Sequence, residues 1–421
     1  MLLVSLPMAS THRLVSPRGS VFWLLGVGVA EILGFVCFII GARPTLGTVF
    51  RFLTAGVAAA VAFTGSVPAT QARPLPSANR QYVDQSAQRF MQTERLPGVS
   101  LVISGPKGSY VKSYGVANLA TRAPFRPTDH VRIASITKSF TATAVLEQVQ
   151  RGRLSLSDKL SRWVRGIPNG NRITVRQLLA MRSGIYDYTS DPAWNRRFNT
   201  NPLSPFTPSD ALSIIRHHRP AFAPGAKTEY ADSNYVLLGI ILQKVTGRSV
   251  ESVITKDVIK PAGLRFTSFP TTSAIPRPFA HGYYAGEDGK GPMRDYTRIN
   301  PRLAWTAGGM ISTVGDVAKW GRILARGSLL SRRLQHQRLH FGMMPAANRI
   351  PFGYGLGIIR LGDWLGHDGA IYGFSSVTFY DRVNGAEITA VANQSSNFTT
   401  PTLDIFGQIA KRLYPGSLRP Q

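Results

Sequence analysis

The stretch GVSLVISGPKGSYVKSYGVAN, residues 98–118, predicts a β-hairpin made of an apolar run, a Gly-Pro-Lys-Gly turn and an alternating return strand. Strand-like segments return from Phe352 onwards as YGLGIIRL, LGHDGAIYGFSSVTFYD and AEITAVANQ, and the helical segment TLDIFGQIAKRLY follows them. Short helices and long Pro/Gly-rich connections fill residues 153–350. The sequence therefore predicts an α/β fold of the α+β type. An antiparallel sheet of N- and C-terminal strands is flanked by helices, and a mostly helical region is inserted.

The composition is that of a globular protein with a strong positive charge. The 421 residues are 43% hydrophobic and 17% charged, and the formal net charge is +27. This charge suits nucleic acid, a membrane surface or an anionic cell-envelope polymer, or it simply keeps the protein soluble. The sequence has no long basic run and no zinc-finger or RNA-binding signature, which argues against nucleic acid. The single cysteine, Cys37, leaves the rest of the chain without disulfides or a cysteine nucleophile.

The first 72 residues are interpreted as an apolar export region. Residues 21–42 are long enough to span a bilayer, and residues 43–72 have the charged, apolar and small-residue parts of a secretory signal. Either the first segment anchors the chain in the membrane, or translation begins near Val49. Both readings place the protein outside the cytoplasm, secreted or membrane-anchored. A linker at 73–81, a folded domain at 82–414 and a tail at 415–421 complete the expected organisation.

The most informative motif is Ser-x-x-Lys, which occurs three times. Ser104 and Ser109 begin copies that fall in the hairpin turn and on its return strand, where the serine and the lysine do not share a face. Only SITKSFTATAVLEQVQRG, which starts at Ser135, has helical spacing, with Gly152 as its natural end. On that helix Ser135 and Lys138 lie on one face, so the amine can accept the hydroxyl proton.

Two later segments carry further polar candidates. TEYADSNYVLLG places Tyr230 in a polar loop just before an apolar helix, where a phenol can hold or relay a proton. GHDGAIYGFSS places His367 and Gly369 at the head of a strand, where a glycine lets a substrate lie close to the backbone. Each segment is also compatible with a purely structural role when it is taken alone.

The three motifs in this order resemble those of the serine penicillin-recognising enzymes. The likeness is to the branch that contains class C β-lactamases, secreted D-alanyl-D-alanine carboxypeptidases and related esterases, and it runs from about Tyr82 to about Leu413. Segments that connect the motifs also resemble this branch, among them LLAMRSGIYDY, FAPGAKTEYADSNYVLLGIILQKVTGRS and TAGGMISTVGDVAKW. The resemblance implies the β-lactamase/transpeptidase-like fold.

The resemblance also implies roles for the matched residues. Ser135 would form an acyl-enzyme, and Lys138 and Tyr230 would act as a coupled pair of proton carriers. The backbone N–H groups of Ser135 and Ala370 would form the oxyanion hole. His367 would take the position of the strand lysine of β-lactamases, next to Gly369, and histidine there is also found in carboxypeptidase-like members.

One position departs from the family pattern. Asp232 stands where an asparagine is usual, and an ionised aspartate accepts hydrogen bonds but donates none. A carboxylate beside Lys138 also favours the charged ammonium, which opposes base catalysis unless the carboxylate points away. This departure weakens the assignment to peptide or β-lactam substrates and leaves esters open.

Three functions therefore remain open. The first is an exported D-alanyl-D-alanine carboxypeptidase-like or weakly β-lactamase-like hydrolase acting on a small molecule or a peptidoglycan peptide. The second is an esterase that uses the same site. The third is a catalytically weak envelope-binding protein. No metal and no cofactor is expected, because the eight histidines are scattered and no His-Glu-x-x-His motif is present.

Overall fold

The computed structural model describes residues 73–286, 288–344, 352–395 and 400–419. The chain divides into two compact units, Met1–Gln71 and Ala72–Gln421. The first unit, with the predicted membrane span, the signal-like segment and Cys37, lies outside the described residues. Within the described part of the chain, no helix has the length and apolar character needed to cross a bilayer.

An eight-stranded antiparallel sheet forms one part of the second unit, in the order β2-β1-β12-β11-β10-β9-β8-β7. β1 and β2 form the predicted hairpin, and β1 pairs directly with β12, so strands from the two ends of the domain lie side by side in the sheet. The strands are β1 (Gly98–Ser104), β2 (Tyr110–Gly115), β7 (Gly342–Met344), β8 (Phe352–Tyr354), β9 (Ile359–Leu361), β10 (Trp364–Ile371), β11 (Phe374–Asp381) and β12 (Ala386–Ala392).

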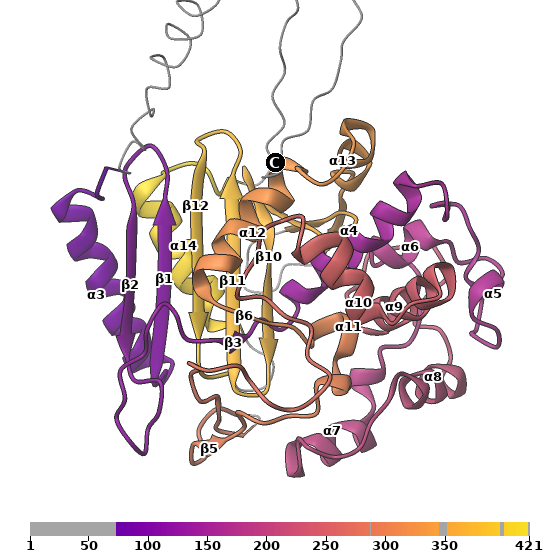
Figure 1. Cartoon of the computed structure of the whole chain (residues 1–421), viewed down its shortest axis with the longest axis horizontal. Helices are drawn as coiled ribbons and strands as arrows, with labels where there is room; N and C mark the ends of the chain where they lie inside the picture. Colours follow the sequence, from indigo (N-terminus) through magenta and orange to yellow (C-terminus); the bar gives the residue numbers. More distant parts are fainter. Residues whose placement is uncertain (1–72, 287, 345–351, 396–399, 420–421) are drawn as a thin grey trace, which may run out of the picture. The chain divides into compact units, whose positions relative to one another are not determined.

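Helices cover both faces of this sheet. α3 (Ser77–Thr93) and α14 (Pro401–Leu413) pack together against one face, while α12 (Val314–Arg326) packs against the other (Figure 1). Every residue of β11 and β12 is buried, because these central strands have a helix layer on each side. The predicted α+β arrangement is confirmed.

The inserted region is mostly helical, as predicted. Its central helices are α4 (Ile136–Gln150) and α9 (Ser233–Thr246), which pack against each other and against the short α11 (Trp305–Gly308). The other helical segments are α5 (Leu160–Trp163), α6 (Val175–Leu179), η1 (Tyr188–Ser190), α7 (Pro192–Thr200), α8 (Pro208–His217), α10 (Val250–Ile254), η2 (Thr255–Ile259), η3 (Pro301–Leu303) and α13 (Arg332–Arg338). Two-stranded pairs join β3 (Val131–Arg132) to β6 (Ile311–Ser312), and β4 (Tyr283–Tyr284) to β5 (Arg294–Asp295).

Two predicted boundaries need correction. The stretch 73–81 is not a linker throughout, because α3 begins at Ser77 directly after Pro76, a residue that is well tolerated at a helix start. The C-terminal tail is packed as far as Ser417, whose hydroxyl accepts a hydrogen bond from the Trp364 indole at 2.8 Å and whose carbonyl binds the Asp363 N–H at 2.9 Å.

Candidate active site

Ser135 directly precedes α4, at the junction of the helical region and the sheet. The preceding residue, Ala134, is buried and has a left-handed backbone with φ of 48°. This conformation is costly for a residue with a side chain, and it persists where the surroundings impose it. Here Ile133 is held on both sides, because its N–H donates to the Met310 carbonyl at 3.0 Å and its carbonyl accepts from Ser376 Oγ at 2.8 Å. The turn therefore holds Ser135 in a fixed place.

Gly369 allows β10 to approach the backbone of Ser135. A Cβ atom at position 369 would lie 2.6 Å from the Ser135 backbone nitrogen. β9 pairs with β10 only as far as Gly366, so the β10 edge near Ala370 has no neighbouring strand among the described residues. Ser135 and Ala370 line the same cavity, and the oxyanion hole formed by their N–H groups stays a prediction.

We expect Gly369→Ala to separate the strand from the nucleophile. The added methyl group should lower kcat/KM by roughly 10- to 100-fold through misplacement of Ser135 and cost about 1–3 kcal/mol of stability. Steady-state kinetics and denaturant unfolding measure the two effects. Gly407→Ala on α14 is the matched control, since a Cβ there meets nothing within 4 Å. Equal activity of the two variants would contradict the close approach.

Lys138 lies one helical turn after Ser135 and is fully buried. Its Nζ atom lies 2.9 Å from Ser135 Oγ, 2.8 Å from the Ala307 carbonyl oxygen and 2.5 Å from Asp232 Oδ1. The amine donates hydrogen bonds to the Ser135 hydroxyl oxygen and to the Ala307 carbonyl oxygen, and the contact with Asp232 is an ion pair.

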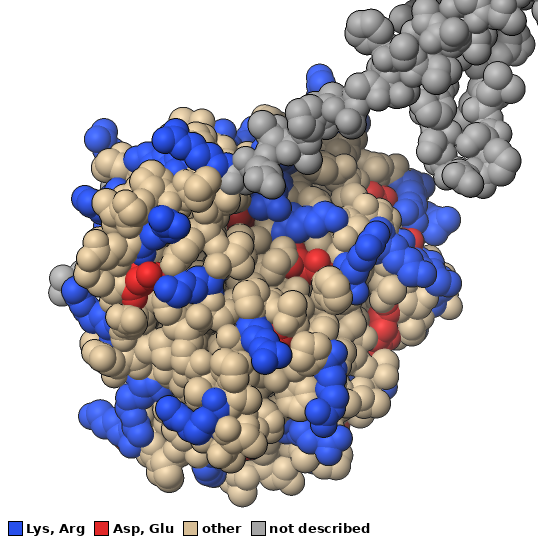
Figure 2. Space-filling model, turned by 60° about the vertical axis from the view of Figure 1, so that its left-hand side comes forward, with Lys and Arg blue, Asp and Glu red and all other residues tan. Residues whose placement is uncertain are grey.

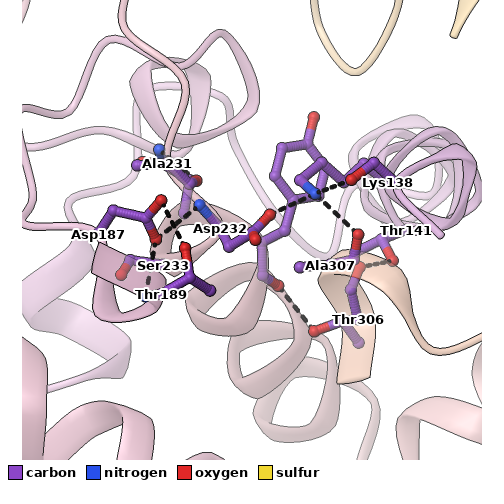
Figure 3. A network of polar contacts seen from close by, with 12 residues as sticks. Lys138, Thr141, Asp187, Thr189, Ala231, Asp232, Ser233, Thr306 and Ala307 are labelled. Carbon is purple, nitrogen blue, oxygen red and sulfur yellow. Dashed lines mark hydrogen bonds and ion pairs between the residues drawn. The ribbon is translucent and has the colours of Figure 1, made fainter. Parts of the chain in front are cut away.

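α11 holds the lysine in place by bonding to both central helices (Figure 3). The Thr141 hydroxyl of α4 donates to the Thr306 carbonyl at 2.8 Å, and the Thr306 hydroxyl donates to the Tyr235 carbonyl of α9 at 2.8 Å. The next carbonyl, that of Ala307, is therefore fixed where it accepts from Lys138.

Tyr230 lies just before α9 and close to both residues of the first motif. The Lys138 Nζ atom lies 4.8 Å from the centre of its ring. Burial, and then the negative charge of Asp232, raise the pKa of the Tyr230 phenol well above its usual value, although a hydrogen bond with Ser135 opposes the rise. The phenol is consequently neutral at physiological pH and keeps its proton close to Ser135 and Lys138. The structure thus brings Ser135, Lys138 and Tyr230 together.

Asp232 lies next to a second carboxylate, that of Asp187, to which the sequence analysis gave no role. Asp187 accepts hydrogen bonds from the Asp232 backbone N–H at 3.1 Å and from the Thr189 hydroxyl at 2.9 Å (Figure 3). Burial, and then the charge of Asp232, raise the pKa of Asp187 to about 7. The carboxylate of Asp232 does not point away from Lys138, so the concern raised by this departure from the family pattern has a structural basis.

His367 lies behind the cavity rather than in its wall. The side chain is fully buried, its Nδ1 lies 2.6 Å from the Asp368 carbonyl oxygen and its Nε2 lies 3.1 Å from the Tyr354 hydroxyl. Burial, and then the positive charge of Lys138, lower the pKa of His367 to about 3. The ring is therefore neutral, with the proton on Nδ1. It reaches Tyr230 only through Tyr354, whose ring meets that of Tyr230 edge-on at 5.9 Å. Its predicted contact with substrate stays a prediction.

A cavity of about 650 Å³ opens above the nucleophile. It is lined by most of the predicted site residues and by several that the sequence analysis did not assign. Two of the unassigned residues, Asp187 and Asp368, lie in the segments SGIYDY and GHDG. The lining residues are Ser135, Asp187, Thr189, Ser190, Asn195, Asn199, Tyr230, Asp232, Tyr284, Phe352, Ile359, Asp368, Gly369, Ala370 and Thr400. Among the described residues, no group of three or more His, Cys, Asp or Glu side chains is arranged to hold a metal ion.

The comparisons with known proteins agree with this geometry. Residues 83–407 match the family model described as Beta-lactamase.

The chain belongs to the beta-lactamase family.

Protein flp of Staphylococcus aureus (strain N315) is 36% identical over 217 residues, which are 50% of this chain and only 42% of that relative's length. Two solved structures match over most of the domain. The D-stereospecific amidohydrolase from Streptomyces sp. is 30% identical, with a TM-score of 0.69 over 80% of this chain and 98% of its own. The penicillin binding protein from Bacillus halodurans is 25% identical, with a TM-score of 0.66 over 78% and 99%. The predicted family is confirmed.

Proposed function

We propose that the protein hydrolyses an amide or an ester through an acyl-enzyme on Ser135. The observation that carries this proposal is the 2.9 Å contact between Lys138 Nζ and Ser135 Oγ beneath an open cavity. The position of Ser135 at the start of α4 supports it as well, because the first N–H groups of a helix favour developing negative charge.

Attack by Ser135 requires Lys138 to have a free electron pair. The 2.5 Å ion pair with Asp232 provides a route, because the ammonium can pass one proton to the carboxylate. A substrate that displaces water from the cavity lowers the local dielectric and favours this neutral pair over the charged one. Lys138 then takes the Ser135 proton while the oxygen bonds to the substrate carbonyl carbon.

Tyr230 completes the cycle in this proposal. Its neutral phenol donates a proton to the leaving group, and the resulting phenolate, next to Lys138, takes a proton from the water that hydrolyses the acyl-enzyme. Lys138 returns a proton to the departing Ser135 oxygen and recovers its own from Asp232. The two groups thus work as a coupled pair, with the amine favoured as the first base.

The finer activity is either carboxypeptidase-like, with weak β-lactamase-like action, or that of an esterase. The relation to penicillin-binding proteins supports the first, and the similar D-stereospecific amidohydrolase supports amide cleavage. Asp232 beside Lys138 supports the second, because activated esters need less help from the base than amides do.

The test compares D-alanine release from a diacyl-D-Ala-D-Ala peptide with hydrolysis of a nitrophenyl ester. We expect measurable turnover of both, with the ester faster. Ester turnover without D-alanine release would decide for the esterase. Asp232→Asn should shift the preference towards the peptide by roughly 10-fold, because it removes the carboxylate from Lys138. An unchanged preference would show that Asp232 does not set it.

We also propose that the enzyme works outside the cytoplasm, secreted or held at the outer face of a membrane. The apolar residues 21–42 and the signal-like residues 43–72 support this location. Figure 2 shows lysine and arginine spread widely over one face, with few acidic residues between them. Such a surface suits an anionic cell-envelope polymer, and a purely envelope-binding role is disfavoured by the assembled Ser135, Lys138 and Tyr230.

A further inference from the structure

The cavity above Ser135 is acidic in a protein that is strongly basic. Its wall contains the side chains of Asp187, Asp232 and Asp368, and no lysine, arginine or histidine is among its described lining residues. The formal net charge of the whole chain is +27. The buried Lys138 supplies one positive charge against these three carboxylates, and it is paired with Asp232. The nucleophile thus faces an excess of negative charge.

Besides Lys138, no cation among the described lining residues makes up for this excess. His367 lies on the same strand, β10, as Asp368. Its ring is buried and uncharged, and it forms a hydrogen bond with the Tyr354 hydroxyl. Burial also raises the pKa of the Asp368 carboxyl, and the Asp187 pKa is raised to about 7. These shifts arise because burial disfavours the charged carboxylates more strongly than their hydrogen bonds and Lys138 stabilise them. A ligand cation would stabilise the charged form further, and a ligand carboxylate would meet repulsion.

Asp368 is the carboxylate best placed to distinguish substrates. It lies on β10 next to Gly369 and two residues before Ala370, so it borders the proposed oxyanion hole. Its side chain is 23% exposed and points to the opposite side of the strand from His367. A hydrogen bond from Thr400 leaves the carboxylate free to accept others.

We propose that Asp368, together with Asp187 and Asp232, makes this cavity select substrates with an ammonium group close to the scissile carbonyl and reject those with a carboxylate there. Amides and esters of amino acids with a free amino group have this chemistry. This inference rests on the proposed acyl-enzyme function. It departs from the carboxypeptidase reading, whose peptide substrates carry a C-terminal carboxylate beside the scissile bond.

Three nitroanilides of D-alanine test the selection, with the amino group free, acetylated or succinylated. They share one scissile bond and one chromophore and differ in charge near it. At pH 7.5, where most of the free amino groups are still protonated and more than half of Asp187, with its pKa of about 7, is ionised, we expect kcat/KM to fall from the free to the acetylated to the succinylated compound. Asp368→Asn should reduce the ratio of the free to the succinylated compound about 10-fold, and high salt should reduce it as well.

Asp158→Asn is the control, since it removes the same charge from a surface ion pair with Arg162 and should leave the ratio unchanged. A ratio that Asp368→Asn leaves at the wild-type value, or a preference for the succinylated compound, would overturn the inference.

Binding of the three matching D-alanine amides to the Ser135→Ala variant, measured by calorimetry, separates the inference from the proposed function. Binding does not require catalysis, so the same ranking is expected there. If the three amides bind in the expected order but the wild type does not hydrolyse the nitroanilides, the inference is supported and the proposed function is contradicted. Turnover that depends on Ser135, without any ranking, would contradict the inference alone.

Discussion

Replacing Ser135 with alanine is expected to lower kcat/KM for a nitrophenyl ester by roughly 10⁴-fold or more, the range seen when a nucleophile is removed. This corresponds to about 5 kcal/mol of transition-state stabilisation. The reason is geometric. The left-handed Ala134 and the close approach of Gly369 place this hydroxyl, rather than that of another serine, above Lys138 and below the cavity.

The sequence offers its own control for this prediction. Ser109 begins another Ser-x-x-Lys copy, but the structure places it next to β2, where its hydroxyl bonds to the Arg73 carbonyl. Ser109→Ala should keep the wild-type rate and stability within experimental error. A variant of Ser135 that retains more than a few per cent of the activity would refute the assignment of the nucleophile.

Lys138→Met is expected to lower kcat roughly 10³-fold, because the serine loses its proton acceptor. The same change leaves the carboxylate of Asp232 without the ammonium at 2.5 Å and so costs up to about 3 kcal/mol of stability. Kinetics and denaturant unfolding therefore should both change, and the single variant alone does not separate a chemical role from a structural one.

The double variant Lys138→Met/Asp232→Asn separates the two roles. The neutral amide removes the unpaired charge, so the free energy of unfolding should return to within about 1 kcal/mol of the wild-type value. Activity should stay as low as in the single variant, since no amine is restored. Recovery of activity together with stability would show that Lys138 holds the fold rather than accepting the proton.

Local patterns were sufficient to predict the elements that carry the site. The Gly-Pro-Lys-Gly turn between two strand-like runs predicted β1 and β2, and the apolar spacing after Ser135 predicted α4 with its end before Gly152. Motif order then grouped Ser135, Lys138 and Tyr230 into one site, because proteins that share that order share the fold that brings them together.

The charge of the cavity depends on contacts between distant segments, which no local pattern contains. Asp187 accepts a hydrogen bond from the backbone N–H of Asp232, which lies 45 residues further along the chain. The ring of His367 packs against Tyr354 because Asp368, the next residue along β10, takes the cavity side. α3 begins at Ser77, inside the predicted linker, because a proline-rich stretch is typical both of a linker and of the residues around a helix start.

Covalent labelling measures the central claim most directly. The purified protein is incubated with a fluorophosphonate or a fluorescent penicillin, and the modified residue is located by peptide mass mapping. A single adduct on the peptide that contains Ser135, absent from the Ser135→Ala variant, is the predicted result. An adduct that persists in the alanine variant, or one that maps to another residue, would contradict the account.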